Sequence, residues 1–360
     1  MNDQVDFKII RPVKYDITQY NEAREIVIET FKNLEGINSI YEFGKINNPG
    51  ISDLDLMFVF EDEITKKDIG YKFESLSLPP WVESLLCGST LMVFSKTDFQ
   101  RVLVWDDLIV NNLYGEEIEL IEIGEDEYLR NIAQIMDWLP ERILSLTRFS
   151  QQKEIPIIRY LGLMHSLNYS LKRIVDLNFL SRKELNHYSR HFEQVDSLRK
   201  NYYMLSDQEV RDMLVDLLLA SLQLGNLAIE KVNSWLSVKN NYYQCSSDSN
   251  GLFLLSDEHG FLIDSNEERR NKSLKEFSHL SLIGVPEIWG LHWKCYSNGD
   301  SFLQINMQNS LSNFDTVNGF IDNQLKIFLL KRIEHCISMS NFLRDHSFSR
   351  GLFKMGWFYK

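Results

Sequence analysis

The feature that most constrains this chain is a pair of aspartates, Asp53 and Asp55, at the start of the apolar run Leu54–Phe60. The run is rich in residues that favour β-strands. Because side chains alternate between the two faces of a strand, residues two positions apart point the same way. The two carboxylates would then lie side by side and repel each other, and a divalent cation with oxygen ligands relieves such repulsion. The pair therefore predicts a strand that opens with a metal site.

The residues before the pair predict the elements that hold it. Apolar residues recur at helical spacing in Thr18–Lys32, which predicts a helix, and Ser39–Phe43 reads as a strand. Gly44 follows this strand and marks a turn. Pro49-Gly50 then favours a loop rather than a helix ahead of Asp53. The expected order is a helix, a strand, a turn and a second strand that carries two acids.

This order and spacing resemble the signature of the DNA polymerase β-like nucleotidyltransferases, which is an apolar residue, Gly-Ser or Gly-Gly, a spacer and an Asp-apolar-Asp/Glu-apolar strand. Gly44, Asp53 and Asp55 match that signature. The resemblance implies that the two aspartates bind Mg²⁺ ions, which hold a nucleoside triphosphate and activate an acceptor hydroxyl. It also implies that the turn at Gly44 contacts the triphosphate. We expect Lys45 to contact a phosphate there, and Ser52 to add a hydrogen bond.

The chain departs from the signature in three ways. Lys45 replaces the usual Ser or Gly with a long cation, and the spacer Ile46–Ser52 is short. The family also places a further carboxylate on a later strand, whereas the expected strand Thr90–Ser95 has none. The acids that could replace it are Asp98, Asp106 and Asp107.

These departures leave two functions open. In the first, the protein is a Mg²⁺-dependent nucleotidyltransferase that moves a nucleoside monophosphate to a hydroxyl of a small molecule, a sugar or a protein. In the second, the fold is catalytically inactive and acts as a nucleotide sensor or interaction module. Lys45 would then neutralise Asp53 or Asp55 and make the metal unnecessary. A third carboxylate beside the pair would favour the enzyme.

The composition of the chain limits the classes of molecule with which it is expected to interact. The formal net charge is −13, whereas a protein that follows a nucleic-acid backbone presents clustered Lys and Arg, so long nucleic acid is an unlikely acceptor. No apolar stretch is long and uninterrupted enough to span a bilayer. The first ten residues contain acids and no signal-peptide core, and the four cysteines show no metal-ligand spacing. We therefore expect a cytoplasmic protein with no membrane partner.

The chain of 360 residues predicts an α+β protein with more than one domain. We expect a nucleotidyltransferase-like mixed sheet with helices in residues 1–125. Periodic apolar positions, as in Ile157–Leu171 and Met213–Ile229, predict a helical domain in residues 126–238. Residues 239–360 are expected to form a smaller mixed α/β region that packs on the helices.

Other candidate residues have ordinary structural explanations. His165 falls within a predicted helix, where a packed histidine is the commoner role. His187 and His191 are four apart, the spacing that places two metal ligands on one helical face, although no third ligand is near in sequence. The tail from His346 to Lys360 is aromatic and basic, and we expect it to dock on the body of the protein.

Overall fold

The computed structural model describes residues 7–64, 78–86, 91–104, 109–122 and 154–239, scattered helical residues in 124–146 and 328–342, and the strand Phe353–Lys354. The chain divides into two compact units. The sheet unit contains Val13–Glu125 and Lys331–Lys360, and the helical unit contains Met1–Pro12 and Asp126–Leu330. Two segments are thus placed differently from the sequence-based division, because the first twelve residues join the helices and the last thirty join the sheet.

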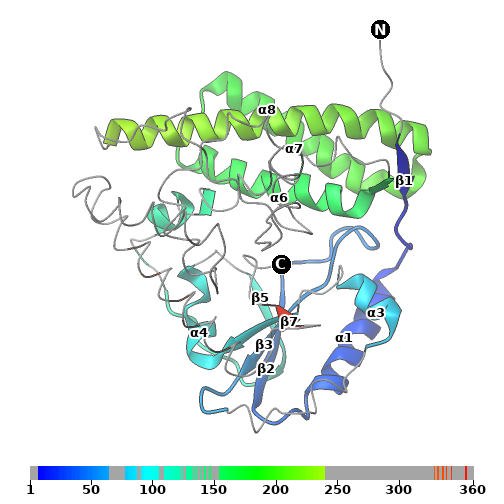
Figure 1. Cartoon of the computed structure of the whole chain (residues 1–360), viewed down its shortest axis with the longest axis vertical. Helices are drawn as coiled ribbons and strands as arrows, with labels where there is room; N and C mark the ends of the chain where they lie inside the picture. Colours follow the sequence, from blue (N-terminus) through cyan, green and yellow to red (C-terminus); the bar gives the residue numbers. More distant parts are fainter. Residues whose placement is uncertain are drawn as a thin grey trace, which may run out of the picture. The chain divides into compact units, whose positions relative to one another are not determined.

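The sheet unit contains a five-stranded mixed sheet in the order β5-β2-β3-β4-β7, shown in Figure 1. Its strands are β2 (Ile37–Phe43), β3 (Asp55–Phe60), β4 (Leu91–Ser95), β5 (Val110–Gly115) and β7 (Phe353–Lys354). β2 runs antiparallel to β3 and β5, whereas β4 is parallel to both β3 and β7. The central strand is β3, the one predicted to carry the acids.

Helix α1 (Ile17–Phe31) covers one face of the sheet. It begins with a capping box. The Asp16 side chain accepts from the backbone N–H of Gln19, and the Gln19 side chain accepts from the backbone N–H of Asp16, so these two amides are satisfied. Its buried residues are Tyr20, Ala23, Val27 and Phe31. The ring of Phe31 meets Phe58 of β3 edge-on, with centroids 5.0 Å apart. The predicted helix over 18–32 is therefore confirmed.

The opposite face of the sheet is covered from α4 (Lys96–Gln100), which follows β4 directly. The ring of Phe99 packs 4.5 Å from Tyr41 and 5.8 Å from Phe94. Tyr41 pairs with Met57, and Phe43 pairs with Asp55 two positions further along. Because side chains alternate between faces, Asp55 belongs to the same face as Tyr41. The sheet unit also contains a short helix, α3 (Pro80–Leu85).

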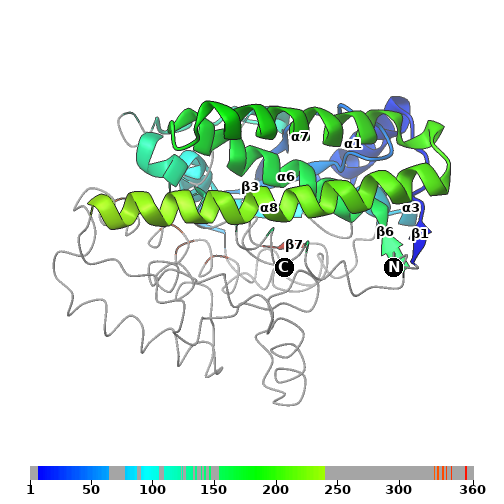
Figure 2. The same cartoon turned by 90° about the horizontal axis from the view of Figure 1, so that it is seen from above.

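The helical unit contains three long helices, α6 (Ile157–Asp176), α7 (Arg182–Asn201) and α8 (Asp207–Lys239), which run beside one another in Figures 1 and 2. Each packs on the other two. A small parallel sheet joins β1 (Lys8–Ile10) to β6 (Glu154–Pro156). Within the described part of the chain, no helix is both long and apolar enough to cross a membrane.

The architecture is mixed α/β, in agreement with the α+β prediction, but two local predictions are wrong. Val102–Val104, expected to belong to a strand, forms a 3₁₀ helix. Leu113–Gly115, expected as a turn, ends strand β5, which contains Asn111 and Asn112. Asparagine is a poor strand former, but pairing with β2 outweighs that local preference. The predicted helix over 66–75 and hairpin over 252–264 lie outside the described residues.

A buried ion pair joins α1 to the sheet. The guanidinium of Arg24 donates to both carboxylate oxygens of Glu42 on β2, at 2.8 and 2.6 Å. The exposed fractions of the two side chains are 17% and 7%. A third bond runs from Arg24 to Asn21 one turn earlier. Bidentate geometry of this kind fixes both distance and orientation between the two elements.

We expect Arg24→Met to lower the free energy of unfolding of the sheet unit by about 3 kcal/mol, because Glu42 is then buried without a counter-charge. The double variant Arg24→Met/Glu42→Leu removes both charges and should lose less. Urea unfolding followed by circular dichroism measures both values. A double variant less stable than the single one would contradict this explanation.

Candidate functional site

The two aspartates lie at one end of the central strand. Asp55 is the first residue of β3 and is half-buried, and Asp53 precedes it in the exposed lead-in. Between them, Leu54 is buried and donates its N–H to the Leu85 carbonyl at 2.9 Å. Leu54, Leu56 and Phe58 have no exposed surface, as the predicted alternation requires. We call this end of the sheet, where β3 begins and β2 ends, the aspartate end.

The turn after β2 brings the backbone to the same end. Phe43, the last residue of β2, pairs with Asp55, and Gly44 follows it with φ +78°. The Gly44 N–H donates to the carbonyl of Ile109 at 3.1 Å. A Cβ at Gly44 would meet nothing within 4 Å, so the backbone conformation, not lack of space, favours glycine there.

Lys45 is exposed next to this turn. Among the described residues, no ion pair links its ammonium to Asp53 or Asp55. The direct pairing of Lys45 with the acids that an inactive relative would use is therefore not seen among the described residues.

Ser52 has a different environment from the one expected of a phosphate contact. Its side chain is buried, and its hydroxyl accepts from the N–H of Asn48 at 3.2 Å. The Ser52 N–H in turn donates to the Asn48 carbonyl at 2.8 Å. The residue thus stabilises the loop that precedes the aspartates, and its bond to a phosphate stays a prediction.

Tyr20 of α1 anchors the same loop and was not singled out from the sequence. Its fully buried hydroxyl donates to the Ser52 carbonyl and accepts from the Gly50 N–H at 2.9 Å. A tyrosine at a core position of a helix is ordinary in sequence, so no pattern reveals this role. Through Tyr20, the helix fixes the loop that leads into Asp53.

A third carboxylate is not found beside the pair in the described part of the chain, where no three metal-binding side chains cluster. Asp98 is excluded by its position, because it follows β4, whose last residue Ser95 pairs with Phe60 at the far end of β3. Five residues of strand separate Phe60 from Asp55, or about 17 Å. Asp98 is also buried, at 1% exposure, and accepts from the Ser95 hydroxyl.

Asp106 and Asp107 lie outside the described residues. The described chain resumes at Ile109, and Val110 of β5 pairs with Phe43, the neighbour of Asp55. The chain therefore enters β5 at the aspartate end. Of the three acids considered from the sequence, Asp98 is therefore the one that the described structure places away from the pair.

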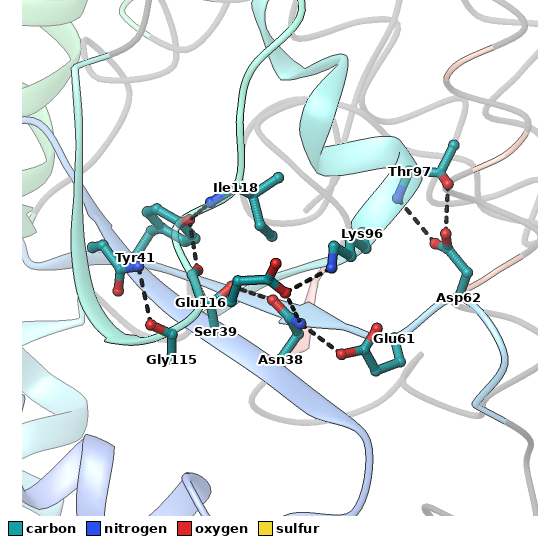
Figure 3. Close-up of polar contacts among 11 residues, drawn as sticks. Asn38, Ser39, Tyr41, Glu61, Asp62, Lys96, Thr97, Gly115, Glu116 and Ile118 are labelled. Carbon is teal, nitrogen blue, oxygen red and sulfur yellow. Dashed lines mark hydrogen bonds and ion pairs between the residues drawn. The ribbon is translucent and has the colours of Figure 1, made fainter.

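A polar network occupies the opposite end of the sheet, as Figure 3 shows. The Asn38 amide donates to Glu61 at 2.6 Å and to Glu116 at 3.1 Å, and Lys96 donates to Glu116 at 2.7 Å. The bond between them raises the pKa of Lys96 and lowers the pKa of Glu116. Each acid has a donor within the network, so these residues hold neighbouring segments together.

Two described histidines of the helical unit, His165 and His191, have structural roles. His191 is buried, its Nε2 lies 3.0 Å from the Ser221 hydroxyl, and burial lowers its pKa to about 4. It therefore packs against α8 rather than joining the exposed His187 in a metal site. His165 lies 3.3 Å from Asp196 without hydrogen-bond geometry, and burial lowers its pKa to about 3. At neutral pH it is an uncharged, packed side chain.

The buried carboxyl of Asp98 predicts an effect on stability that a residue of the candidate site would not have. Burial raises the pKa of its carboxyl above 3.8, against hydrogen bonds from Ser338 and Ser95. An acid whose pKa is higher when folded binds its proton more tightly in that state, so ionisation reduces stability as pH rises through the folded pKa. We expect Asp98→Asn to raise Tm by a few degrees at pH 7 and by much less near pH 4. An equal gain at both pH values in thermal unfolding would contradict this.

No protein-family model, curated protein or solved structure matches this chain. The features of the chain that bear on function are therefore the aspartates at the start of β3, the glycine turn beside them and the exposed Lys45.

Proposed function

We propose that the protein is a Mg²⁺-dependent nucleotidyltransferase that uses Asp53 and Asp55. One observation carries the proposal: Asp55 opens a buried central strand directly opposite the end of β2 and its glycine turn, and Asp53 lies two residues before it in the exposed lead-in. A rigid strand end presents carboxylates with little freedom to move apart, which suits a site that must hold phosphates.

The order of the elements supports the same assignment. Helix α1, strand β2, the turn at Gly44 and strand β3 follow one another as they do in the DNA polymerase β-like nucleotidyltransferases that the sequence resembles. The loop between Gly44 and Asp53 is closed by its own hydrogen bonds and by Tyr20. This compact loop takes the place of the longer spacer of the family.

The donor set fits Mg²⁺, which prefers carboxylate oxygens and keeps part of its water shell. Asp53 and Asp55 would hold the ion, and its charge would supply stabilisation of the phosphates during transfer to a hydroxyl. Gly44, with open space in front of its Cα, lets a phosphate approach the backbone. Lys45 pairs with a phosphate as a point charge.

The acceptor class follows from charge. A net charge of −13 disfavours a polyanionic acceptor, so the proposed acceptor is a hydroxyl of a small molecule, a sugar or a protein. A nucleotide sensor remains the second candidate, because the described residues supply only two acids at this end of the sheet. Transfer activity, rather than binding alone, separates the two functions.

We expect Asp53→Asn to abolish Mg²⁺-dependent nucleotide binding and transfer while changing the free energy of unfolding by less than about 0.5 kcal/mol, because the side chain is exposed. Calorimetry with each ribonucleoside triphosphate, with and without Mg²⁺, measures the binding. Asp62→Asn is the matched control, since Asp62 bonds Thr97 at the opposite end of the sheet. Full transfer activity in Asp53→Asn would refute the assignment.

The third acid can be identified by comparing neighbours. We expect one of Asp106→Asn and Asp107→Asn to reduce transfer by about 10- to 100-fold, the loss typical of a residue that holds or orients a metal ligand, and the other to reduce it little. Transfer of a labelled nucleotide to the protein itself or to a panel of sugars gives the rate. If both variants transfer as fast as the unaltered protein, neither residue completes the site. If the unaltered protein binds nucleotide but transfers none, the sensor is the better candidate.

A further inference from the structure

The face of the sheet that carries Asp55 also carries apolar side chains at the aspartate end. Phe43 lies directly opposite Asp55 in the pairing of β2 with β3, and Val110 of β5 lies opposite Phe43 on its other side. Because directly opposite residues share a face, the three side chains form one row across neighbouring strands. Each of the three is half-buried, so each keeps some exposed surface.

The cover that buries this face elsewhere does not enclose the row. Tyr41, two positions earlier on β2 and on the same face, is only 3% exposed and packs against Phe99 of α4. Phe43 lies nearer the end of the strand and is less covered. Ile109, whose carbonyl accepts from the Gly44 N–H, adds further apolar surface there and is 60% exposed. Apolar surface beside a few polar groups is typical of a site for a small organic ligand.

We propose that Phe43 and Val110 form a shelf on which the base of a purine nucleoside triphosphate stacks. The proposal rests on the proposed nucleotidyltransferase function, because its ligand is the nucleotide whose phosphates Asp53 and Asp55 would bind through the metal ion. Directly opposite residues of an antiparallel pair have Cβ atoms about 5 Å apart. The ribose, which joins the phosphates of a nucleotide to its base, would lie over the step from Asp55 to Phe43.

The ring of Phe43 predicts the class of base. An aromatic side chain can stack on the π-face of any base, and the preference among bases follows the strength of stacking. A purine has two fused rings and a pyrimidine has one, so a purine covers more of the surface that Phe43 and Val110 provide. We therefore expect ATP and GTP to bind more tightly than CTP and UTP.

The ordinary role of Phe43 is packing within the sheet. An aromatic residue opposite a β-branched one is a stabilising pair in antiparallel strands. That role predicts that a smaller side chain lowers Tm and leaves the recognition of the base unchanged. A stacking role predicts a loss of affinity that is confined to ligands with a base.

The test compares Mg²⁺-ATP with Mg²⁺-tripolyphosphate, which has three phosphates and neither ribose nor base, by calorimetry on the full chain. We expect Phe43→Leu to weaken Mg²⁺-ATP by about 5- to 50-fold and Mg²⁺-tripolyphosphate by less than about 2-fold. Phe43→Tyr keeps the ring and should retain the affinity for Mg²⁺-ATP. Phe192→Leu, the same change at a half-buried position on α7, is the matched control and should bind both ligands as the unaltered chain does.

A panel of bases tests the class of ligand. In the unaltered chain we expect Mg²⁺-ATP and Mg²⁺-GTP to bind about 3- to 10-fold more tightly than Mg²⁺-CTP and Mg²⁺-UTP. The difference should narrow in Phe43→Leu, because the ring that favours the larger base is gone. Equal binding of all four triphosphates by the unaltered chain would overturn the assignment to purines.

The outcomes separate the two proposals. If the unaltered chain binds neither Mg²⁺-ATP nor Mg²⁺-tripolyphosphate, the proposed function fails and the shelf fails with it. If the unaltered chain binds both and Phe43→Leu keeps its affinity for Mg²⁺-ATP, or loses both ligands alike, only the shelf is overturned. Thermal unfolding checks that each variant is folded. If Phe43→Leu is unstable, Val110→Ala replaces it, and it too should weaken Mg²⁺-ATP more than Mg²⁺-tripolyphosphate.

Discussion

The burial of β3 on both faces is the constraint on which the rest of the sheet unit depends. Leu56 and Phe58 have no exposed surface, nor do Met57 and Val59 between them, and strands flank β3 on both sides. Polar groups can therefore stand only at its ends. Its N-terminal end carries Asp53 and Asp55, and its C-terminal end leads to Glu61 and the network of Figure 3. The acids at the C-terminal end, Glu61 and Glu116, accept hydrogen bonds from Asn38 and Lys96 and so hold neighbouring segments together.

Contacts between α1, the sheet and the loop before Asp53 then fix the structure of the aspartate end. The Arg24–Glu42 pair and the Phe31–Phe58 contact hold α1 against the sheet, and Tyr20 carries that rigidity to the loop before Asp53. Because the loop is held by buried bonds, its shape does not depend on a ligand. Under the proposed function, this end of the sheet would have its shape before a metal ion or nucleotide binds, which would reduce the entropy lost on binding.

The sequence predicted the elements whose signals are local. The strand-forming apolar run Leu54–Phe60 and the helical spacing over Thr18–Lys32 depend on neighbours in the chain, and both predicted elements agree with the structure. Strand β5 was missed because Asn111 and Asn112 oppose it locally and only pairing with β2 forms it. Asp98 could not be excluded without the parallel register of β3 and β4, which places it at the wrong end. The sequence also does not reveal the roles of Tyr20 and Ser52. Tyr20 acts through hydrogen bonds to Gly50 and Ser52, thirty or more residues away, and Ser52 acts through the turn that brings Asn48 to it.

Each unit is built from two separate segments of the chain. The first twelve residues belong with helices that come more than a hundred residues later, and the last thirty complete a sheet that begins near residue 37. On the ribosome, most of the sheet would emerge long before β7 exists, leaving the β4 edge unpaired while the helical unit is still being made. Neither unit corresponds to a continuous stretch that could be cut out and expressed whole. The sheet unit can reach its final form only after the residues of β7 have been synthesised.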